Sequence, residues 1–145
     1  MASSVFAEEA GNRSLNALVF WGVTVGILQA FLPVAFWWLD QDVVWAVSLV
    51  VIASIYVGFA VADGRSRVIA VEMFVAAAFI ILACVAITAS PWLVVVGLMA
   101  HGLKDLWQHR THFVANTRWW PPFCLVVDVI VSAAIAILLM AGVEL

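Results

Sequence analysis

One stretch decides the class of fold: Val68-Ile-Ala-Val-Glu-Met-Phe-Val-Ala-Ala-Ala-Phe-Ile-Ile-Leu-Ala-Cys-Val-Ala-Ile-Thr-Ala89. Its only charged residue is Glu72, and it is long enough for a bilayer crossing, which takes about 20 apolar residues in an α-helix. The whole chain of 145 residues shares this character, since 67% of it is hydrophobic and 10% is charged. Soluble domains have about 45–50% apolar and about 25% charged residues. The composition therefore indicates that lipid, not water, is the solvent of this chain.

Further apolar runs on both sides predict four more membrane-spanning helices. Pro33 lies within the first run and predicts a kink, because proline cannot donate a hydrogen bond to the carbonyl of Gln29. Gly22 and Gly26 are four residues apart, a spacing that lets a neighbouring helix approach closely. The sequence predicts an all-α integral membrane protein, a bundle of five transmembrane helices. A polar segment at 1–14 precedes one transmembrane domain at 15–145, with spans at about 15–39, 43–62, 68–89, 91–110 and 122–143.

The ends of two spans carry recognisable signals. Gly64 suits the C-terminal turn of the second helix. Ser90 followed by Pro91 is typical of a helix N-cap and first helical position. The third and fourth spans are therefore expected to join with almost no loop, or alternatively to pack as a re-entrant pair.

The charged residues predict the orientation of the bundle. With the N-terminus in the cytoplasm and the C-terminus outside, every Lys and Arg lies on or near the cytoplasmic side, as the positive-inside rule requires. These residues are Arg13, Arg65, Arg67, Lys104, Arg110 and Arg118, while Asp40, Asp42 and Glu144 lie outside. The expected location is the inner (plasma) membrane of a bacterial cell. The net charge of −3 and the absence of a basic cluster give no indication of a nucleic-acid partner.

A polar stripe ends the fourth span. His101, Asp105, His109 and His112 fall within roughly 80° of arc on a helix that turns about 100° per residue. The rise along a helix separates His101 from His109 by about 12 Å, too far for one ion on a straight helix. The stripe therefore divides into a deep pair, His101 and Asp105, and a shallow part in which His109 pairs with Asp105 or with His112.

Carboxylates on two other spans lie at the depth of the deep pair. Glu72 and Asp128, with His101 and Asp105, are expected to form one layer in the cytoplasmic half of the membrane. Ionisable groups at such depth usually mark function. Mixed imidazole and carboxylate ligands suit a divalent metal such as Zn, Fe or Mn. The layer predicts a metal-dependent enzyme that acts on a lipid or small amphiphile, with Asp128 and Glu72 as candidate catalytic groups and His109 as a further ligand.

Other interpretations of the same residues stay open. Glu72, Asp105 and Asp128 are also the groups that a proton-coupled transporter or ion carrier would use as a relay. A purely structural hydrogen-bonded network in an assembly subunit, with the chain as a homo-oligomer, explains the layer as well. Tyr56 can donate a hydrogen bond into the layer, whereas Cys124 is a soft ligand or simply a small packing residue.

The pattern of polar residues resembles that of small bacterial polytopic membrane proteins of unknown function. The resemblance is carried by Tyr56-x-Gly-Phe-Ala-x-x-Asp-Gly-Arg65, His101-Gly-x-x-Asp-x-x-x-His109 and Trp120-Pro-Pro-Phe-Cys-x-x-x-Asp128. It implies no activity. A looser similarity of chemistry links the layer to the seven-helix alkaline-ceramidase-like hydrolases, which use membrane-embedded His, Asp and zinc, but this chain has fewer helices and a different order of motifs.

Overall fold

A computed structural model describes the backbone of residues 2–143 and the side chains of residues 14–143. The predicted polar segment 1–14 therefore has its side chains almost entirely outside the described residues, and Glu144 lies outside them too. The described residues form helices joined by short turns and contain no strand. Its elements are α1 (Ala2–Ala30), α2 (Leu32–Ala35), α3 (Gln41–Asp63), α4 (Ser66–Ala89), α5 (Trp92–Thr111) and α6 (Trp120–Met140).

Three described helices are long and apolar enough to cross a membrane: α3, α4 and α6. The apolar part of α1, Ser14–Ala30, is shorter. Helix α5 is long enough to cross a membrane, but it is not among these candidates because its second half carries the charged residues Lys104, Asp105 and Arg110. The structure thus establishes a helical chain with three candidate spans, consistent with a membrane protein.

The predicted first span, residues 15–39, is wrong as a single kinked helix. Helix α1 ends at Ala30, Phe31 leaves helical geometry, and Pro33 lies near the start of the separate short helix α2. The property of Pro33 that predicts a kink also explains the end of α1. Pro33 cannot donate a hydrogen bond to the carbonyl of Gln29, and its ring crowds that carbonyl. The helix therefore ends here instead of bending.

Two other helix ends lie within one residue of the sequence signals, although Pro91 and not Ser90 is the N-cap of α5, which begins at Trp92. Gly64 adopts the left-handed conformation with φ of 81° and donates its N–H to the carbonyl of Ala60, which ends α3. Ser90 Oγ accepts a hydrogen bond from the Trp92 amide at 3.3 Å at the start of α5. Helices α4 and α5, of 24 and 20 residues, are therefore joined by a tight turn, as the sequence predicts.

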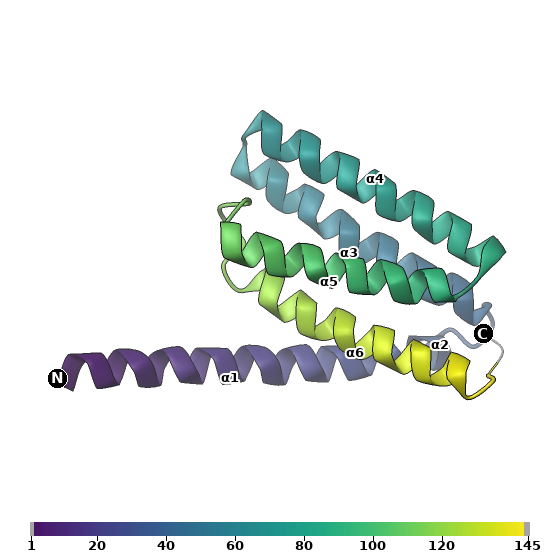
Figure 1. Cartoon of the computed structure of the whole chain (residues 1–145), viewed down its shortest axis with the longest axis horizontal. Helices are drawn as coiled ribbons and strands as arrows, with labels where there is room; N and C mark the ends of the chain where they lie inside the picture. Colours follow the sequence, from purple (N-terminus) through teal and green to yellow (C-terminus); the bar gives the residue numbers. More distant parts are fainter. Residues whose placement is uncertain (1, 144–145) are drawn as a thin grey trace.

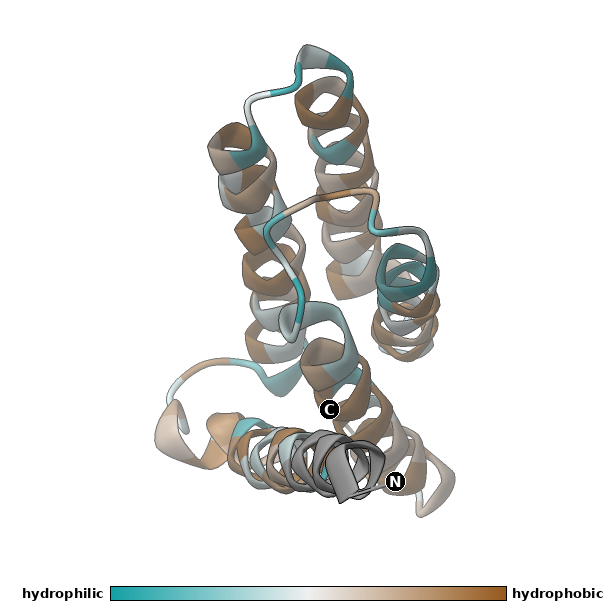
Figure 2. Cartoon of the chain, turned by 90° about the vertical axis from the view of Figure 1, so that its left-hand side faces the viewer, coloured by the Kyte–Doolittle hydropathy of each residue, from teal (hydrophilic) through white to brown (hydrophobic). Residues whose placement is uncertain are grey.

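Helices α3 and α4 pack against each other and both contact α5, α5 packs against α6, and α6 packs against α1, with α2 near one end of the bundle (Figure 1). Helix α1 packs along α6 through its glycines, since a Cβ on Gly22 would lie 2.9 Å from the Cβ of Val126 and one on Gly26 would lie 3.0 Å from that of Ile130. The predicted close approach at these glycines is confirmed. Figure 2 shows the polar residues gathered in the connections at the bundle end that carries the α3–α4 and α5–α6 loops.

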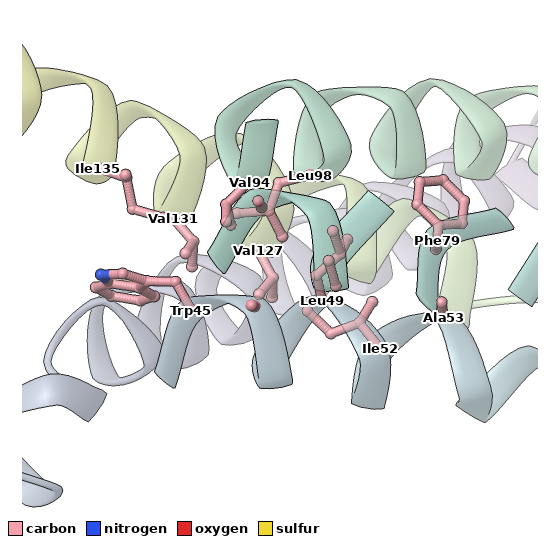
Figure 3. Packing of buried hydrophobic residues seen from close by; sticks show 13 residues of the cluster. Trp45, Leu49, Ile52, Ala53, Phe79, Val94, Leu98, Val127, Val131 and Ile135 are labelled. Carbon is pink, nitrogen blue, oxygen red and sulfur yellow. The ribbon is translucent and has the colours of Figure 1, made fainter. Parts of the chain in front are cut away.

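The core fills the opposite half of the bundle with apolar side chains. Trp45 and Leu49 from α3, Leu98 from α5, and Val131 and Ile135 from α6 meet there and are almost fully buried (Figure 3). The buried hydroxyl of Ser48 bonds to the carbonyl of Val44 in its own helix, so it adds no polar contact between helices. The ionisable groups of the bundle therefore lie nearer the end formed by the α3–α4 and α5–α6 loops.

Candidate functional site

The deepest ionisable cluster consists of His101 and Asp105 from α5 and Asp128 from α6. All three side chains have 0% exposure. His101 Nδ1 lies 2.8 Å from Asp128 Oδ2 and 3.6 Å from Asp105 Oδ2. One ligand atom from each residue lies within 4.8 Å of the other two, so this triad could hold a metal ion.

The local sequence explains why the triad converges. His101 and Asp105 are one turn apart on α5, which puts both on the face that meets α6. Gly102 lies on the same interface, where an added Cβ would be 3.1 Å from Leu125 Cδ1 and 3.5 Å from Asp128 Cβ. The missing side chain of Gly102 therefore lets α6 come close enough for Asp128 to reach the imidazole.

Aromatic rings hold the imidazole of His101 in place. The ring centroid of Tyr56 lies 5.5 Å from it and that of Phe79 lies 5.3 Å from it, both edge-on. His101 Nε2, both carboxylate oxygens of Asp105 and Oδ1 of Asp128 are buried and have no hydrogen-bond partner among the described residues. Buried polar atoms are rarely left in this state. The triad thus has unused ligand capacity.

A second buried cluster lies beside the triad and contains Glu72. Lys104 Nζ lies 2.9 Å from Glu72 Oε2 and 3.5 Å from the centroid of the Tyr56 ring. The side-chain amide of Gln108 donates to the other oxygen of Glu72. Glu72 is therefore paired with a cation from α5, and the structure does not bring it into the triad.

The predicted four-ligand layer thus divides into two clusters. The structure brings together His101, Asp105 and Asp128, but Glu72 pairs with Lys104, which the sequence places only on the flank of the stripe. The sequence does hold a signal for this pairing, because Lys104 and Gln108 are one turn apart on α5 and so share the face that contacts α4. His109 and His112 are exposed, with ring centroids 6.4 Å apart, and neither reaches the triad.

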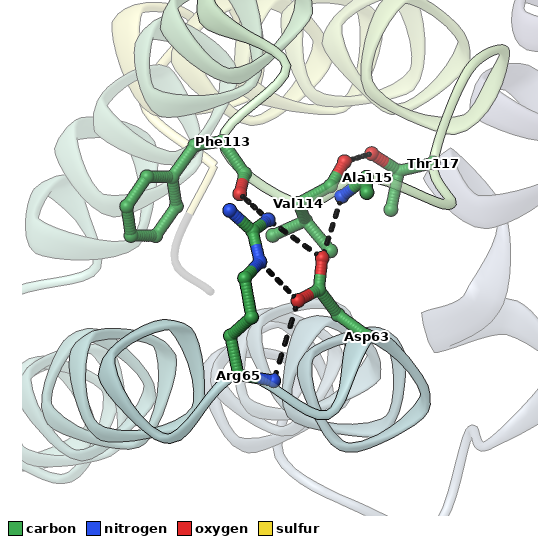
Figure 4. A network of polar contacts seen from close by, with 6 residues as sticks. All are labelled: Asp63, Arg65, Phe113, Val114, Ala115 and Thr117. Atoms are coloured by element: carbon green, nitrogen blue, oxygen red, sulfur yellow. Dashed lines mark hydrogen bonds and ion pairs between the residues drawn. The ribbon is translucent and has the colours of Figure 1, made fainter.

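A polar clasp closes the loop end of the bundle (Figure 4). Asp63 accepts hydrogen bonds from Arg65 Nε at 2.6 Å and from the amide of Ala115 at 2.8 Å, and Arg65 Nη2 donates to the carbonyl of Phe113 at 2.7 Å. The hydrogen bond that Arg65 donates to Asp63 raises the pKa of Arg65 above its ordinary value. Val114, held by this clasp, is buried against Ala60 of α3 and Val68 of α4. The α5–α6 loop is thereby tied to the α3–α4 hairpin.

Comparison with protein-family models, with curated proteins and with solved structures gives no match to this chain. Any functional conclusion therefore depends on the geometry of the triad, its neighbours and the surrounding helices.

Proposed function

We propose that this chain is a multi-pass integral membrane protein that binds one divalent cation through His101, Asp105 and Asp128 and acts on a lipid or a small amphiphile. One observation carries the proposal: three buried side chains with metal-ligand chemistry converge, and several of their ligand atoms have no hydrogen-bond partner among the described residues. Ionisable side chains at membrane depth are costly unless something neutralises them.

Charge balance favours a divalent cation. Lys104 is the cation of the second cluster and is already paired with Glu72. The carboxylates of Asp105 and Asp128 therefore have no positive partner of their own apart from the imidazole of His101. A doubly charged ion would compensate both carboxylates at once.

The distances also suit an ion. Zn–N and Zn–O bonds of about 2.1 Å in tetrahedral geometry place two ligand atoms about 3.4 Å apart. His101 Nδ1 lies 3.6 Å from Asp105 Oδ2 and 2.8 Å from Asp128 Oδ2. The first distance is already close to that spacing, and a small displacement of the Asp128 carboxylate would bring the second to it. One imidazole with two carboxylates suits Zn²⁺, Fe²⁺ or Mn²⁺.

The chemistry of such a site follows from its ligand set. Three protein ligands leave a position open, and a bound ion there supplies a Lewis acid that polarises a carbonyl oxygen or makes a water molecule more acidic. Asp128 Oδ1, which has no hydrogen-bond partner among the described residues, would be the oxygen left to take up a proton, so Asp128 would also act as the general base. Glu72 would act as a positioning residue, since its carboxylate holds Lys104 and Gln108.

The position of the triad favours one-sided access over transport. Polar side chains extend from the triad through Lys104 and Glu72 toward the loop end, whereas the opposite half of the described bundle is packed with apolar side chains. A proton or ion relay needs polar groups on both sides of the binding site. The proposed function is therefore an enzyme whose site lies nearer one face of the membrane.

The proposed topology has five spans, with α1 and α5 completing the three candidate spans and the N-terminus in the cytoplasm of a bacterial cell. Support comes from the clustering of Arg65, Arg67, Arg110 and Arg118 at or near the loop end of the bundle, which would face the cytoplasm of the inner membrane. Reporter fusions at residue 65 and at the C-terminus test this orientation. Activity on the same side for both fusions would contradict it.

Metal analysis of purified protein tests the cation site. The protein is purified with a tag that lacks histidine and its metal content is measured by elemental mass spectrometry. We expect one divalent ion per chain in the wild type, and loss of most of it in His101→Ala and in Asp128→Asn. The matched control is His109→Ala, an exposed histidine on the same helix, which should keep the ion. A metal-free wild type would favour the assembly-subunit interpretation.

A further inference from the structure

One tyrosine connects the two buried polar clusters. Tyr56 of α3 is the only tyrosine in the chain, and it has 0% exposure. Lys104 Nζ, which pairs with Glu72, lies 3.5 Å from the centroid of its ring. The ring also lies edge-on to the imidazole of His101, with the two centroids 5.5 Å apart. Helix α3 supplies no residue of the triad, so Tyr56 brings a third helix into contact with the proposed metal site.

The hydroxyl of Tyr56 lies beside the carboxylate of Asp105. Of the side chains that act on this carboxylate, Tyr56 is the one close enough to donate a hydrogen bond. The contact falls short of a well-formed hydrogen bond, since the Tyr56 oxygen and both Asp105 oxygens are buried without a partner among the described residues. Buried hydroxyl and carboxylate oxygens usually have partners. A donor and an acceptor with spare bonding capacity therefore lie side by side.

The chemistry of the two groups defines their roles. A phenol can donate its O–H, whereas an ionised carboxylate only accepts. A carboxylate has two oxygens, so one can bind a cation while the other accepts a hydrogen bond. Asp105 Oδ2 lies on the side of His101, 3.6 Å from Nδ1. Asp105 would therefore bind an ion through Oδ2 and leave Oδ1 for the hydroxyl of Tyr56.

We propose that Tyr56 is a positioning residue of the metal site, which donates a hydrogen bond to Asp105 Oδ1 and so holds Oδ2 toward the ion. The proposal rests on the function proposed above, because it assigns the outer partner of one proposed ligand. Groups that hydrogen-bond to metal ligands orient them, and their loss typically weakens metal binding by about 10–100-fold. The contacts of the Tyr56 ring with Lys104 and His101 hold the donor in place before the ion binds.

A role in packing alone gives different expectations. In that case the hydroxyl of Tyr56 is a buried donor without a partner, which lowers stability. Its removal would then leave metal binding unchanged. In the positioning role, removal of the hydroxyl weakens metal binding, although the metal-free protein stays at least as stable as before.

Zinc binding to the purified, metal-free protein tests the positioning role. Zn²⁺ is titrated into the wild type and into Tyr56→Phe, which lacks only the hydroxyl, and the affinity is measured by calorimetry. We expect Tyr56→Phe to bind Zn²⁺ about 10–100-fold more weakly, with a metal-free stability equal to or above that of the wild type. The matched control is Ser132→Ala, which removes a buried hydroxyl that already bonds to the carbonyl of Val129 in its own helix. This control should bind Zn²⁺ like the wild type.

Fluorination of the phenol gives a second readout, which a loss of folding would not imitate. Because the chain has one tyrosine, biosynthetic incorporation of 3-fluorotyrosine changes Tyr56 alone. The fluorine withdraws electrons and makes the hydroxyl a stronger hydrogen-bond donor, while the ring keeps its shape. We expect the fluorinated protein to bind Zn²⁺ about threefold more tightly than the wild type. The affinity should therefore rise in the order phenylalanine, tyrosine, fluorotyrosine at this position.

The outcomes separate this proposal from the proposed function. A wild type that binds one Zn²⁺ per chain, with equal affinity in Tyr56→Phe and in the fluorinated protein, would overturn the positioning role and leave the cation site standing. An equal loss of affinity in Ser132→Ala and Tyr56→Phe would overturn it too, since the effect would not depend on the contact with Asp105. A wild type that binds no divalent ion would remove both proposals.

Discussion

Replacement of Glu72 by glutamine should destabilise the protein without changing metal binding at the proposed His101–Asp105–Asp128 site. The Lys104 and Glu72 charges are 2.9 Å apart, and their side chains are 12% and 1% exposed. At an effective dielectric constant of 20, charges at this distance attract by about 6 kcal/mol, but desolvation offsets part of that gain. Removing one partner of a buried pair typically costs about 3–5 kcal/mol, because the other charge stays buried alone. We expect Glu72→Gln to lower the free energy of unfolding by about that amount.

The double variant Glu72→Gln with Lys104→Met provides the control. It removes both charges and keeps most of the side-chain volume, so its stability should return to within about 1 kcal/mol of the wild type. The loss of the contact between Lys104 Nζ and the Tyr56 ring accounts for part of any residual difference. Unfolding by sodium dodecyl sulfate in mixed micelles, followed by circular dichroism, measures all three free energies.

If Glu72→Gln keeps its stability within about 1 kcal/mol of the wild type and loses its metal, Glu72 is a ligand and not the partner of Lys104. The four-ligand layer expected from the sequence would then be right, and the division into two clusters would be wrong.

Two further predictions concern the packing and the closure of the bundle. Gly22→Ala should destabilise the protein by about 1–3 kcal/mol in the same unfolding assay, since the new methyl group overlaps Val126, while Gly58→Ala, with open space around it, should be neutral or stabilising. Asp63→Ala should increase amide hydrogen exchange in residues 113–117 several-fold, because the Ala115 amide loses its acceptor and Arg65 loses its anchor. Asp40→Ala is the matched control, since Asp40 makes no side-chain cap hydrogen bond, and equal exchange in the two variants would show that the clasp does not hold the loop.

Local signals in the sequence are enough to predict the apolar, helical character of the chain and most helix boundaries. These signals are the runs of apolar residues, the glycine after α3 and the serine before α5. Each acts on its own segment, through hydration or backbone geometry, so it can be interpreted without knowing the fold. The exception is the break before α2, where Pro33 predicts an interruption but not whether the helix bends or ends.

Only the tertiary structure decided which ionisable groups meet. The rise along each helix fixes the depth of Glu72 and Asp128, and both were expected near His101 on that basis. Depth leaves open the rotation of each helix about its axis and the identity of its neighbours. Close packing at Gly102 turns Asp128 toward His101, whereas α4 presents Glu72 to Lys104. Contacts between distant segments set those rotations, and so they separated the proposed metal ligands from the buried ion pair.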